Sequence, residues 1–160
     1  MIVVDTSVAL KWVVAEDRRT AARQVLASGK MLHAPELMVL EAANTLRKKL
    51  RTKQIGLDQM TAGLAFIRQS VGVLPMGGYF DDATALSAEL DHSIYDCCFL
   101  ACARQIGSLF VTDDLVFLRK CETSRYGEQV LGLSEVGDGG LERALLRVPH
   151  IVSFSSREAD

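Results

Sequence analysis

Carboxylate side chains follow two apolar segments of the sequence, at the point where each segment ends. Asp5 follows residues 2–4, and Asp113 and Asp114 follow residues 109–112. Short, continuous apolar runs of this kind predict buried strands. Ligands of open α/β sheets bind beyond the carboxyl ends of the strands, so these acids stand where a site is expected.

Two further acids lie in apolar surroundings within predicted helices. Asp96 belongs to residues 94–103, a segment that is apolar on every side and therefore expected to be central. Glu41 lies beside the apolar stripe of the helix expected over residues 36–52. Charged groups are rarely buried without a partner, and neither acid has an Arg or Lys near it in sequence.

Each acid also has a simpler interpretation. The acids that follow the two strands can cap helices, which stabilises a helix by about 1 kcal/mol. Ser93 and Asp96 match a capping box, and Glu41 can bend out to solvent. Taken together, these interpretations explain less well why several acids fall at element ends or on otherwise apolar faces.

A cation would explain the pattern as a whole. Clustered carboxylates repel one another, and at least one pKa rises unless a positive charge neutralises them. Mg²⁺ suits such a site because it takes oxygen ligands at about 2.0–2.1 Å. The sequence therefore points to a divalent-metal site.

The elements that must position these acids are strands alternating with helices, which predicts an α/β fold with a parallel sheet covered on both faces. The 160 residues are typical of one domain. The strands are expected at residues 2–4, 31–34, 72–75, 109–112 and 129–133. The helices are expected at residues 8–15, 18–28, 36–52, 57–70, 79–90 and 94–106, with a short one that ends at Lys120.

The composition is that of a globular protein, with 49% hydrophobic and 24% charged residues. The 18 basic and 20 acidic residues give a net charge of −2, which argues against nucleic-acid binding through bulk charge. A nucleic-acid substrate would need a local basic strip or bound metal ions to offset its phosphates.

The expected location is the cytoplasm. No apolar run approaches the roughly 18 residues that cross a bilayer, and the first five residues do not look like a signal peptide. The four cysteines form no CxxC pair and are expected to be buried core residues in a reducing compartment.

The sequence lacks the motifs by which several common classes of α/β enzyme are identified. No glycine-rich loop follows the first strand, so neither a dinucleotide fold nor a P-loop enzyme is supported. No second acid stands two residues after Asp5, which weakens an aspartyl-phosphate phosphatase, and no serine lies in a G-x-S-x-G elbow.

Four segments in order and spacing resemble the PIN-domain family, and within it the VapC-type toxin ribonucleases of toxin–antitoxin modules. They are Met1 to Val8, Ala34 to Leu46, His92 to Asp96, and Leu109 to Asp114. The resemblance covers roughly residues 1–135. It implies a parallel sheet with strand order 3-2-1-4-5, which would bring Asp5 and Asp114 together.

The resemblance also implies a Mg²⁺- or Mn²⁺-dependent endoribonuclease. Asp5, Glu41 and Asp96 match the three best-kept acids of the family, and Asp114 matches the fourth, while Asp113 takes a variable position beside it. These four acids are the expected catalytic and metal-binding residues. The expected supporting residues are Thr6, Ser7, Asn44, Thr112 and Asp113.

The implied partners are an RNA substrate and a small antitoxin protein, with a homodimer or a larger assembly with the antitoxin as the expected state. Val8, Leu10 and Trp12 are candidates to meet that antitoxin or a second subunit. The basic strip at residues 47–53 either guides RNA toward the site or is a solvated helix end. His33, His92 and His150 are expected to be structural or solvated.

The nuclease domain is expected to span residues 1–136, followed by an extension of unknown role at residues 137–160. Within the extension, residues 141–147 are expected to form one or two helical turns and residues 151–154 a weak edge strand.

Two other classes of function are less well supported. One is a catalytically silent PIN-like module that acts through protein contacts, which leaves the retention of four acids unexplained. The other is a phospho-acceptor receiver domain, which needs a paired acid after the first strand and a lysine after a late strand, and neither is evident.

Overall fold

The computed structural model describes residues 1–148 and contains a five-stranded, wholly parallel sheet in the order β3-β2-β1-β4-β5. The strands are β1 (Ile2–Val4), β2 (Leu32–Pro35), β3 (Gly72–Leu74), β4 (Leu109–Thr112) and β5 (Val130–Gly132). The predicted α/β fold and strand order are confirmed. β1 lies at the centre, where Ile2 pairs with Leu32 on one side and Leu109 on the other.

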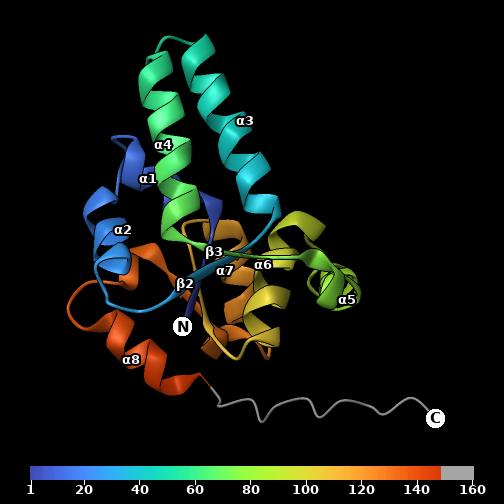
Figure 1. Ribbon diagram of the computed structural model, residues 1–160. Coiled ribbons are helices and arrows are strands. Elements are labelled where there is room, and N and C mark those ends of the chain that lie inside the picture. The colour runs from blue at the N-terminus through green and yellow to red at the C-terminus, as the bar shows by residue number, and fades with distance from the viewer. Residues whose placement is uncertain (149–160) are drawn as a thin grey trace.

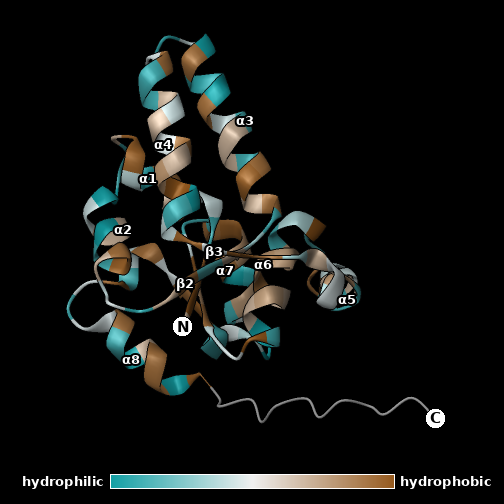
Figure 2. Cartoon of the chain, in the orientation of Figure 1, coloured by the Kyte–Doolittle hydropathy of each residue, from teal (hydrophilic) through white to brown (hydrophobic). Residues whose placement is uncertain are grey.

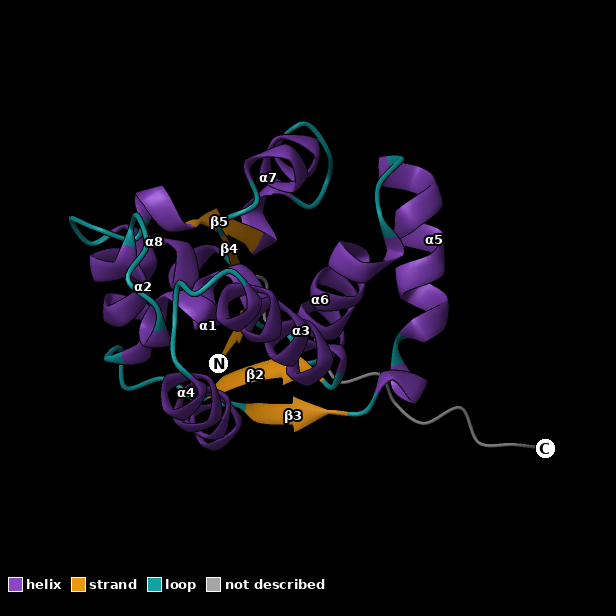
Figure 3. Ribbon diagram, turned by 90° about the horizontal axis from the view of Figure 1, so that it is seen from above, coloured by secondary structure: helices purple, strands orange, loops and turns teal. Residues whose placement is uncertain are grey.

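Among the described residues, eight α-helices connect the strands and cover the sheet (Figure 1). They are α1 (Thr6–Val13), α2 (Arg19–Leu26), α3 (Leu37–Arg51), α4 (Leu57–Ser70), α5 (Phe80–Leu90), α6 (Ile94–Gln105), α7 (Leu115–Glu122) and α8 (Gly140–Arg147). Seen from above, α5 and α6 lie to one side of the strands and α1 and α2 to the other (Figure 3). Helices α3 and α4 form a hairpin that projects beyond the sheet (Figure 1).

The core is built from the strands and from α6. The central strands are apolar (Figure 2), and β1 is completely buried. Every residue of α6 from Cys97 to Ala103 is buried, as the all-round apolar sequence predicts. The four cysteines are free and buried, in agreement with a core role.

The topology places four helix N-termini at one edge of the sheet. Helices α1, α3 and α7 follow β1, β2 and β4, so they begin at the carboxyl ends of those strands. Helix α6 runs back to the start of β4 and therefore also begins at that edge. The positive ends of four helix dipoles thus face the region where the sequence predicts carboxylates.

Most predicted boundaries agree with the structure within about two residues, as expected of fraying ends. Helix α1 begins at Thr6 rather than Val8, because the residue after β1 already serves as its N-cap. The fifth strand is shorter than predicted, since 3-10 turns take up the residues on both sides of it: η2 (Gly127–Gln129) and η3 (Leu133–Glu135).

Helix α8 packs against the domain rather than extending from it. Leu141 and Ala144 are buried on its inner face, and Gly140 lies against the backbone of η3. The edge strand predicted at residues 151–154 lies outside the described residues. Within residues 1–148, no helix is both long and apolar enough to span a bilayer.

Replacement of Gly140 by alanine is expected to disrupt the docking of α8. A Cβ atom at this position would lie 1.7 Å from the carbonyl oxygen of Glu135, so the backbone must move. We expect the Gly140→Ala variant to lose about 2 kcal/mol of unfolding free energy in urea denaturation. Gly137→Ala is the matched control, because a Cβ there has no neighbour within 4 Å among the described residues. Equal stability of the two variants would show that the contact is not tight.

Candidate metal centre

A pocket of about 370 Å³ lies at the carboxyl edge of the sheet, where α1, α3, α6 and α7 begin. All four acids singled out as catalytic in the sequence line it. The lining residues are Asp5, Thr6, Ser7, Leu10, Glu41, Asn44, Thr45, Lys48, Asp96 and Asp114. The fold therefore brings together side chains separated by up to 109 positions in the sequence.

Asp5 is the most buried of these acids, with 8% of the residue exposed. Its Oδ2 atom accepts hydrogen bonds from the hydroxyls of Ser7 at 2.7 Å and Thr112 at 2.6 Å. The Thr112 hydroxyl also accepts the backbone N–H of Asp114 at 3.0 Å. One threonine thus links the ends of β1 and β4, which pair side by side in the sheet.

Glu41 comes to the pocket from the second turn of α3. The Thr6 hydroxyl donates a hydrogen bond to its Oε2 atom at 2.6 Å. Thr6 begins α1, so this bond joins the start of α1 to α3. Thr6 and Ser7, the expected supporting residues, each donate a hydrogen bond to a different carboxylate, Thr6 to Glu41 and Ser7 to Asp5.

Asp114 is both the N-cap of α7 and a residue of the pocket lining. Its Oδ1 atom accepts the backbone N–H groups of Val116 at 2.8 Å and Phe117 at 3.0 Å, so it caps α7. The same side chain lines the pocket. Because Oδ1 is bound to the start of α7, the carboxylate has a fixed position. Its other oxygen, Oδ2, takes no part in the cap.

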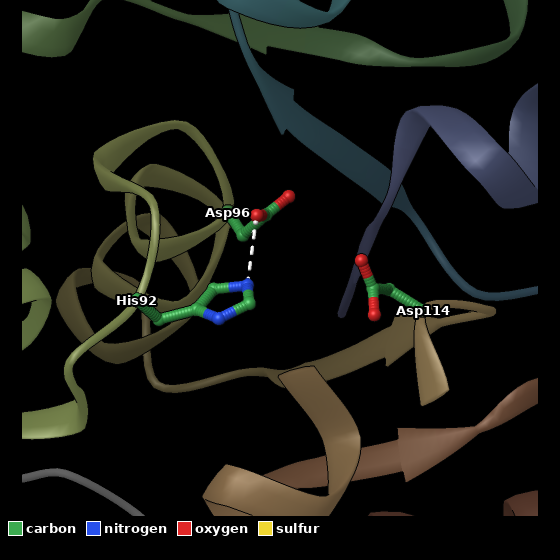
Figure 4. Close-up of side chains that lie close together, drawn as sticks. All are labelled: His92, Asp96 and Asp114. Carbon is green, nitrogen blue, oxygen red and sulfur yellow. Dashed lines mark ion pairs between the residues drawn. The ribbon is translucent and has the colours of Figure 1, made fainter. Parts of the chain in front are cut away.

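Asp96 lies in the first turn of α6 and faces His92 and Asp114 (Figure 4). The Nε2 atom of His92 lies 3.0 Å from Oδ2 of Asp96. One ligand atom from each of the three side chains can be chosen so that all lie within 4.8 Å of one another. His92, expected to be structural or solvated, lies with its ring beside Asp96 and is not among the lining residues of the pocket within residues 1–148.

Asp113 has a different environment from its neighbour. Its carboxylate pairs with Lys11 Nζ at 3.0 Å and with Arg18 Nε at 2.6 Å, and Glu16 lies 3.3 Å from Lys11. The Asp113 and Lys11 side chains are only 7% and 8% exposed. Asp113 therefore neutralises a buried lysine, and within residues 1–148 it is not part of the pocket lining.

Three of the pocket carboxylates, those of Asp5, Glu41 and Asp96, have a raised pKa. Burial raises the pKa of Asp5, and the charge of Asp114 adds to the effect, while hydroxyl donors partly oppose it. Burial also raises the pKa of Glu41 and of Asp96, and both feel the charge of Asp5. Three pKa values raised in one pocket indicate an excess of negative charge.

The opposite holds for Asp113. Burial alone would raise its pKa, but hydrogen bonds and charges from Arg18 and Lys11 outweigh burial and lower the pKa. Adjacent aspartates thus occupy environments of opposite electrostatic character.

The donor set fits a hard divalent cation. Four carboxylates supply oxygen atoms, the ligands that Mg²⁺ and Mn²⁺ prefer. A cation would also offset the repulsion between carboxylates, which adds to burial in raising the three pKa values. Asp5, Glu41, Asp96 and Asp114 are therefore the residues that would hold it.

The remaining polar residues of the pocket lie on one face of α3. Glu41, Asn44, Thr45 and Lys48 are spaced three to four residues apart, so they line the pocket in succession. Lys49 instead pairs with Glu16 at 2.6 Å. Part of the basic strip therefore reaches the site, and part of it stabilises the packing of α3 on the loop after α1.

The three apolar residues of α1 that were candidates to meet an antitoxin or a second subunit are not exposed. Val8, Leu10 and Trp12 are all at most 7% exposed, and the Trp12 indole donates to the Ala22 carbonyl at 2.9 Å. All three residues are part of the hydrophobic core, and Leu10 also lines the pocket. His33 lies in β2, away from the pocket lining, and His150 lies outside the described residues.

Neutralising Asp5 and neutralising Asp113 should change stability in opposite directions. A carboxylate with a raised pKa stabilises the fold below its ordinary pKa, and this contribution is lost as the pH rises through the folded-state value. Asp5→Asn should therefore exceed wild type in stability without metal, increasingly so toward neutral pH, since the amide oxygen still accepts from Ser7 and Thr112.

Asp113 has a lowered pKa, so its contribution is present at neutral pH and is lost as the pH falls through the folded-state value. Asp113→Asn leaves Lys11 with Glu16 alone, and we expect a loss of about 2 kcal/mol at neutral pH that disappears in acid. Thermal unfolding in EDTA across this pH range measures both effects, with the exposed Asp81→Asn as control. Shifts of the same sign in the two variants would contradict the separation of roles.

Comparisons with known proteins place this geometry in a family. The PIN domain family profile matches residues 2–122. Ribonuclease VapC9 of Mycobacterium tuberculosis is 34% identical over 116 residues, which cover 72% of this chain and 87% of that protein.

Two solved structures share the fold. The crystal structure of PAE2754 from Pyrobaculum aerophilum aligns with a TM-score of 0.63 at 20% identity, covering 92% of this chain and 88% of that chain. A toxin–antitoxin complex from Klebsiella pneumoniae contains a chain that aligns with a TM-score of 0.62 at 14% identity, covering 83% and 98%. With a profile match over more than half of its length and this relative, the chain belongs to the PIN domain family.

Proposed function

We propose that this protein is a divalent-metal-dependent endoribonuclease that hydrolyses single-stranded or structured RNA. The observation that carries the proposal is the convergence of Asp5, Glu41, Asp96 and Asp114 on one open pocket. The similarity to a protein named a ribonuclease supports the choice of RNA as substrate. Mg²⁺ or Mn²⁺ is the proposed cofactor, because the pocket offers oxygen donors and excess negative charge.

The chain's own residues prepare the pocket for a phosphodiester. A bound divalent cation supplies Lewis acidity and offsets the negative charge of the scissile phosphate. Ser7 and Thr112 hold one oxygen of Asp5, and Thr6 holds one oxygen of Glu41, so these carboxylates are fixed before substrate arrives. Fixed ligands reduce the reorganisation needed during the reaction.

A cationic side chain at the pocket offers an approach for the RNA backbone. Lys48 lines the pocket two turns beyond Glu41, and Asn44 lies between them on the same face of α3. A lysine ammonium attracts a phosphate as a point charge, and an amide can donate to its oxygens. In this proposal the projecting α3–α4 hairpin (Figure 1) leads RNA to the acidic pocket despite the net charge of −2.

We further propose that the protein acts in the cytoplasm as the toxin of a type II toxin–antitoxin pair, with a small antitoxin as partner and a homodimer or larger assembly as its state. The alignment with a chain of a toxin–antitoxin complex supports this role. The four buried free cysteines agree with a reducing compartment.

Cleavage of a mixed single-stranded RNA pool by the purified protein tests the enzymatic proposal. We expect cleavage with Mg²⁺ or Mn²⁺, none with EDTA, and at least about a hundredfold loss in Asp96→Asn. Asp81→Asn, the same change at an exposed site on α5, should cleave like wild type. Equal activity in wild type and Asp96→Asn would indicate a contaminating nuclease. Divalent-ion binding without cleavage would favour a silent binding module.

Expression in growing cells tests the toxin role. Wild type should arrest growth, and Asp5→Asn should relieve the arrest at an equal protein level measured by immunoblot. The variant keeps the hydroxyl donors of the pocket paired but removes one carboxylate charge. Normal growth with abundant wild-type protein would contradict the proposal.

A further inference from the structure

His92 is held in place by two helices other than the one it precedes. Its backbone N–H donates to the Ser87 carbonyl at 3.1 Å, and its own carbonyl accepts the Ser87 hydroxyl at 2.6 Å, so α5 anchors its main chain. Its ring packs on Phe117 of α7, with ring centroids 4.7 Å apart and planes inclined by 31°. The imidazole therefore has a defined position rather than a solvated one.

The Nε2 atom of this ring is buried without a hydrogen bond. It lies 3.0 Å from Oδ2 of Asp96, but the direction of its N–H does not meet the geometry of a hydrogen bond, and no other atom of residues 1–148 supplies a partner. Such atoms are rare in folded proteins because the lost hydrogen bond to water is not replaced. His92 is not itself among the lining residues of the pocket within residues 1–148, but its ring lies beside Asp96 and Asp114, which are (Figure 4).

The spacing of these atoms suits neighbouring ligands of one ion. With metal–ligand bonds of about 2.1 Å, adjacent corners of an octahedron are separated by about 3.0 Å. The Nε2 to Oδ2 distance is 3.0 Å, and one ligand atom each from His92, Asp96 and Asp114 can be chosen so that all three lie within 4.8 Å of one another. Asp114, whose Oδ1 atom caps α7, is the third side chain of this group and adds a carboxylate donor.

We propose that His92 is a nitrogen ligand of a divalent cation on the Asp96–Asp114 side of the pocket, and that it biases the site toward Mn²⁺ or another transition-metal ion over Mg²⁺. This inference rests on the proposed metal-dependent function. Imidazole binds first-row transition metals well, whereas Mg²⁺ prefers an all-oxygen shell. The alternative, in which His92 only orients Asp96 through a hydrogen bond, would leave the metal shell without nitrogen.

Pulsed electron paramagnetic resonance of the Mn²⁺-loaded full chain separates these alternatives. A coordinated imidazole gives electron spin-echo modulation from ¹⁴N, and this modulation should vanish in protein labelled with ¹⁵N-histidine. It should also vanish in His92→Gln and persist in His33→Gln, which makes the same change in β2 away from the pocket lining. The wild-type labelling result stands even if a variant folds poorly.

Binding titrations measure the predicted selectivity. We expect His92→Gln to lose about tenfold in Mn²⁺ affinity, followed through the signal of free Mn²⁺, and to change less in Mg²⁺ affinity by competition. Bound Mn²⁺ without histidine nitrogen coupling, or equal loss for both ions, would overturn the assignment and leave the ribonuclease proposal standing. Absence of Mn²⁺ binding to wild type would overturn both.

Discussion

Repulsion between carboxylates at the carboxyl edge of the sheet is the constraint on which the rest of the structure depends. Asp5, Glu41, Asp96 and Asp114 share one pocket, and burial raises the pKa of the first three. The fold tolerates this charge because helix N-termini, hydroxyl donors and an imidazole surround it. Each compensation is partial, which leaves a negative pocket suited to a cation.

The same edge shows how the backbone separates two kinds of acid. Successive residues of an extended segment point in opposite directions, so Asp113 and Asp114 emerge on different sides of the chain after β4. One meets Lys11 and Arg18, and the other caps α7 at the pocket. The cationic pair joins α1 to the end of β4, so a structural ion pair supports the frame in which the pocket is held.

Sequence patterns were enough to predict the strands, the strand order through family resemblance, and the pocket acids. Asp5 and Asp114 come after the short apolar segments that form β1 and β4, and Asp96 precedes a continuous apolar segment of α6. The role of His92 depends on Phe117 and Asp114, which lie more than 20 positions away, so no local pattern reveals it. Likewise, an apolar Trp12 gives no indication whether α2 or a partner protein covers it.

The burial of α6 limits how far one side of the pocket can move. It is buried from Cys97 to Ala103, so it cannot shift without repacking the core, and Asp96 stands in the turn directly before this buried segment. Glu41, in the second turn of α3, is tied to α1 by the Thr6 hydroxyl, whereas Lys48 lies two turns farther along the projecting hairpin (Figure 1). The four acids of the pocket are therefore anchored to the body of the domain, and the lysine of the pocket reaches it from the part of α3 that leads away from that body.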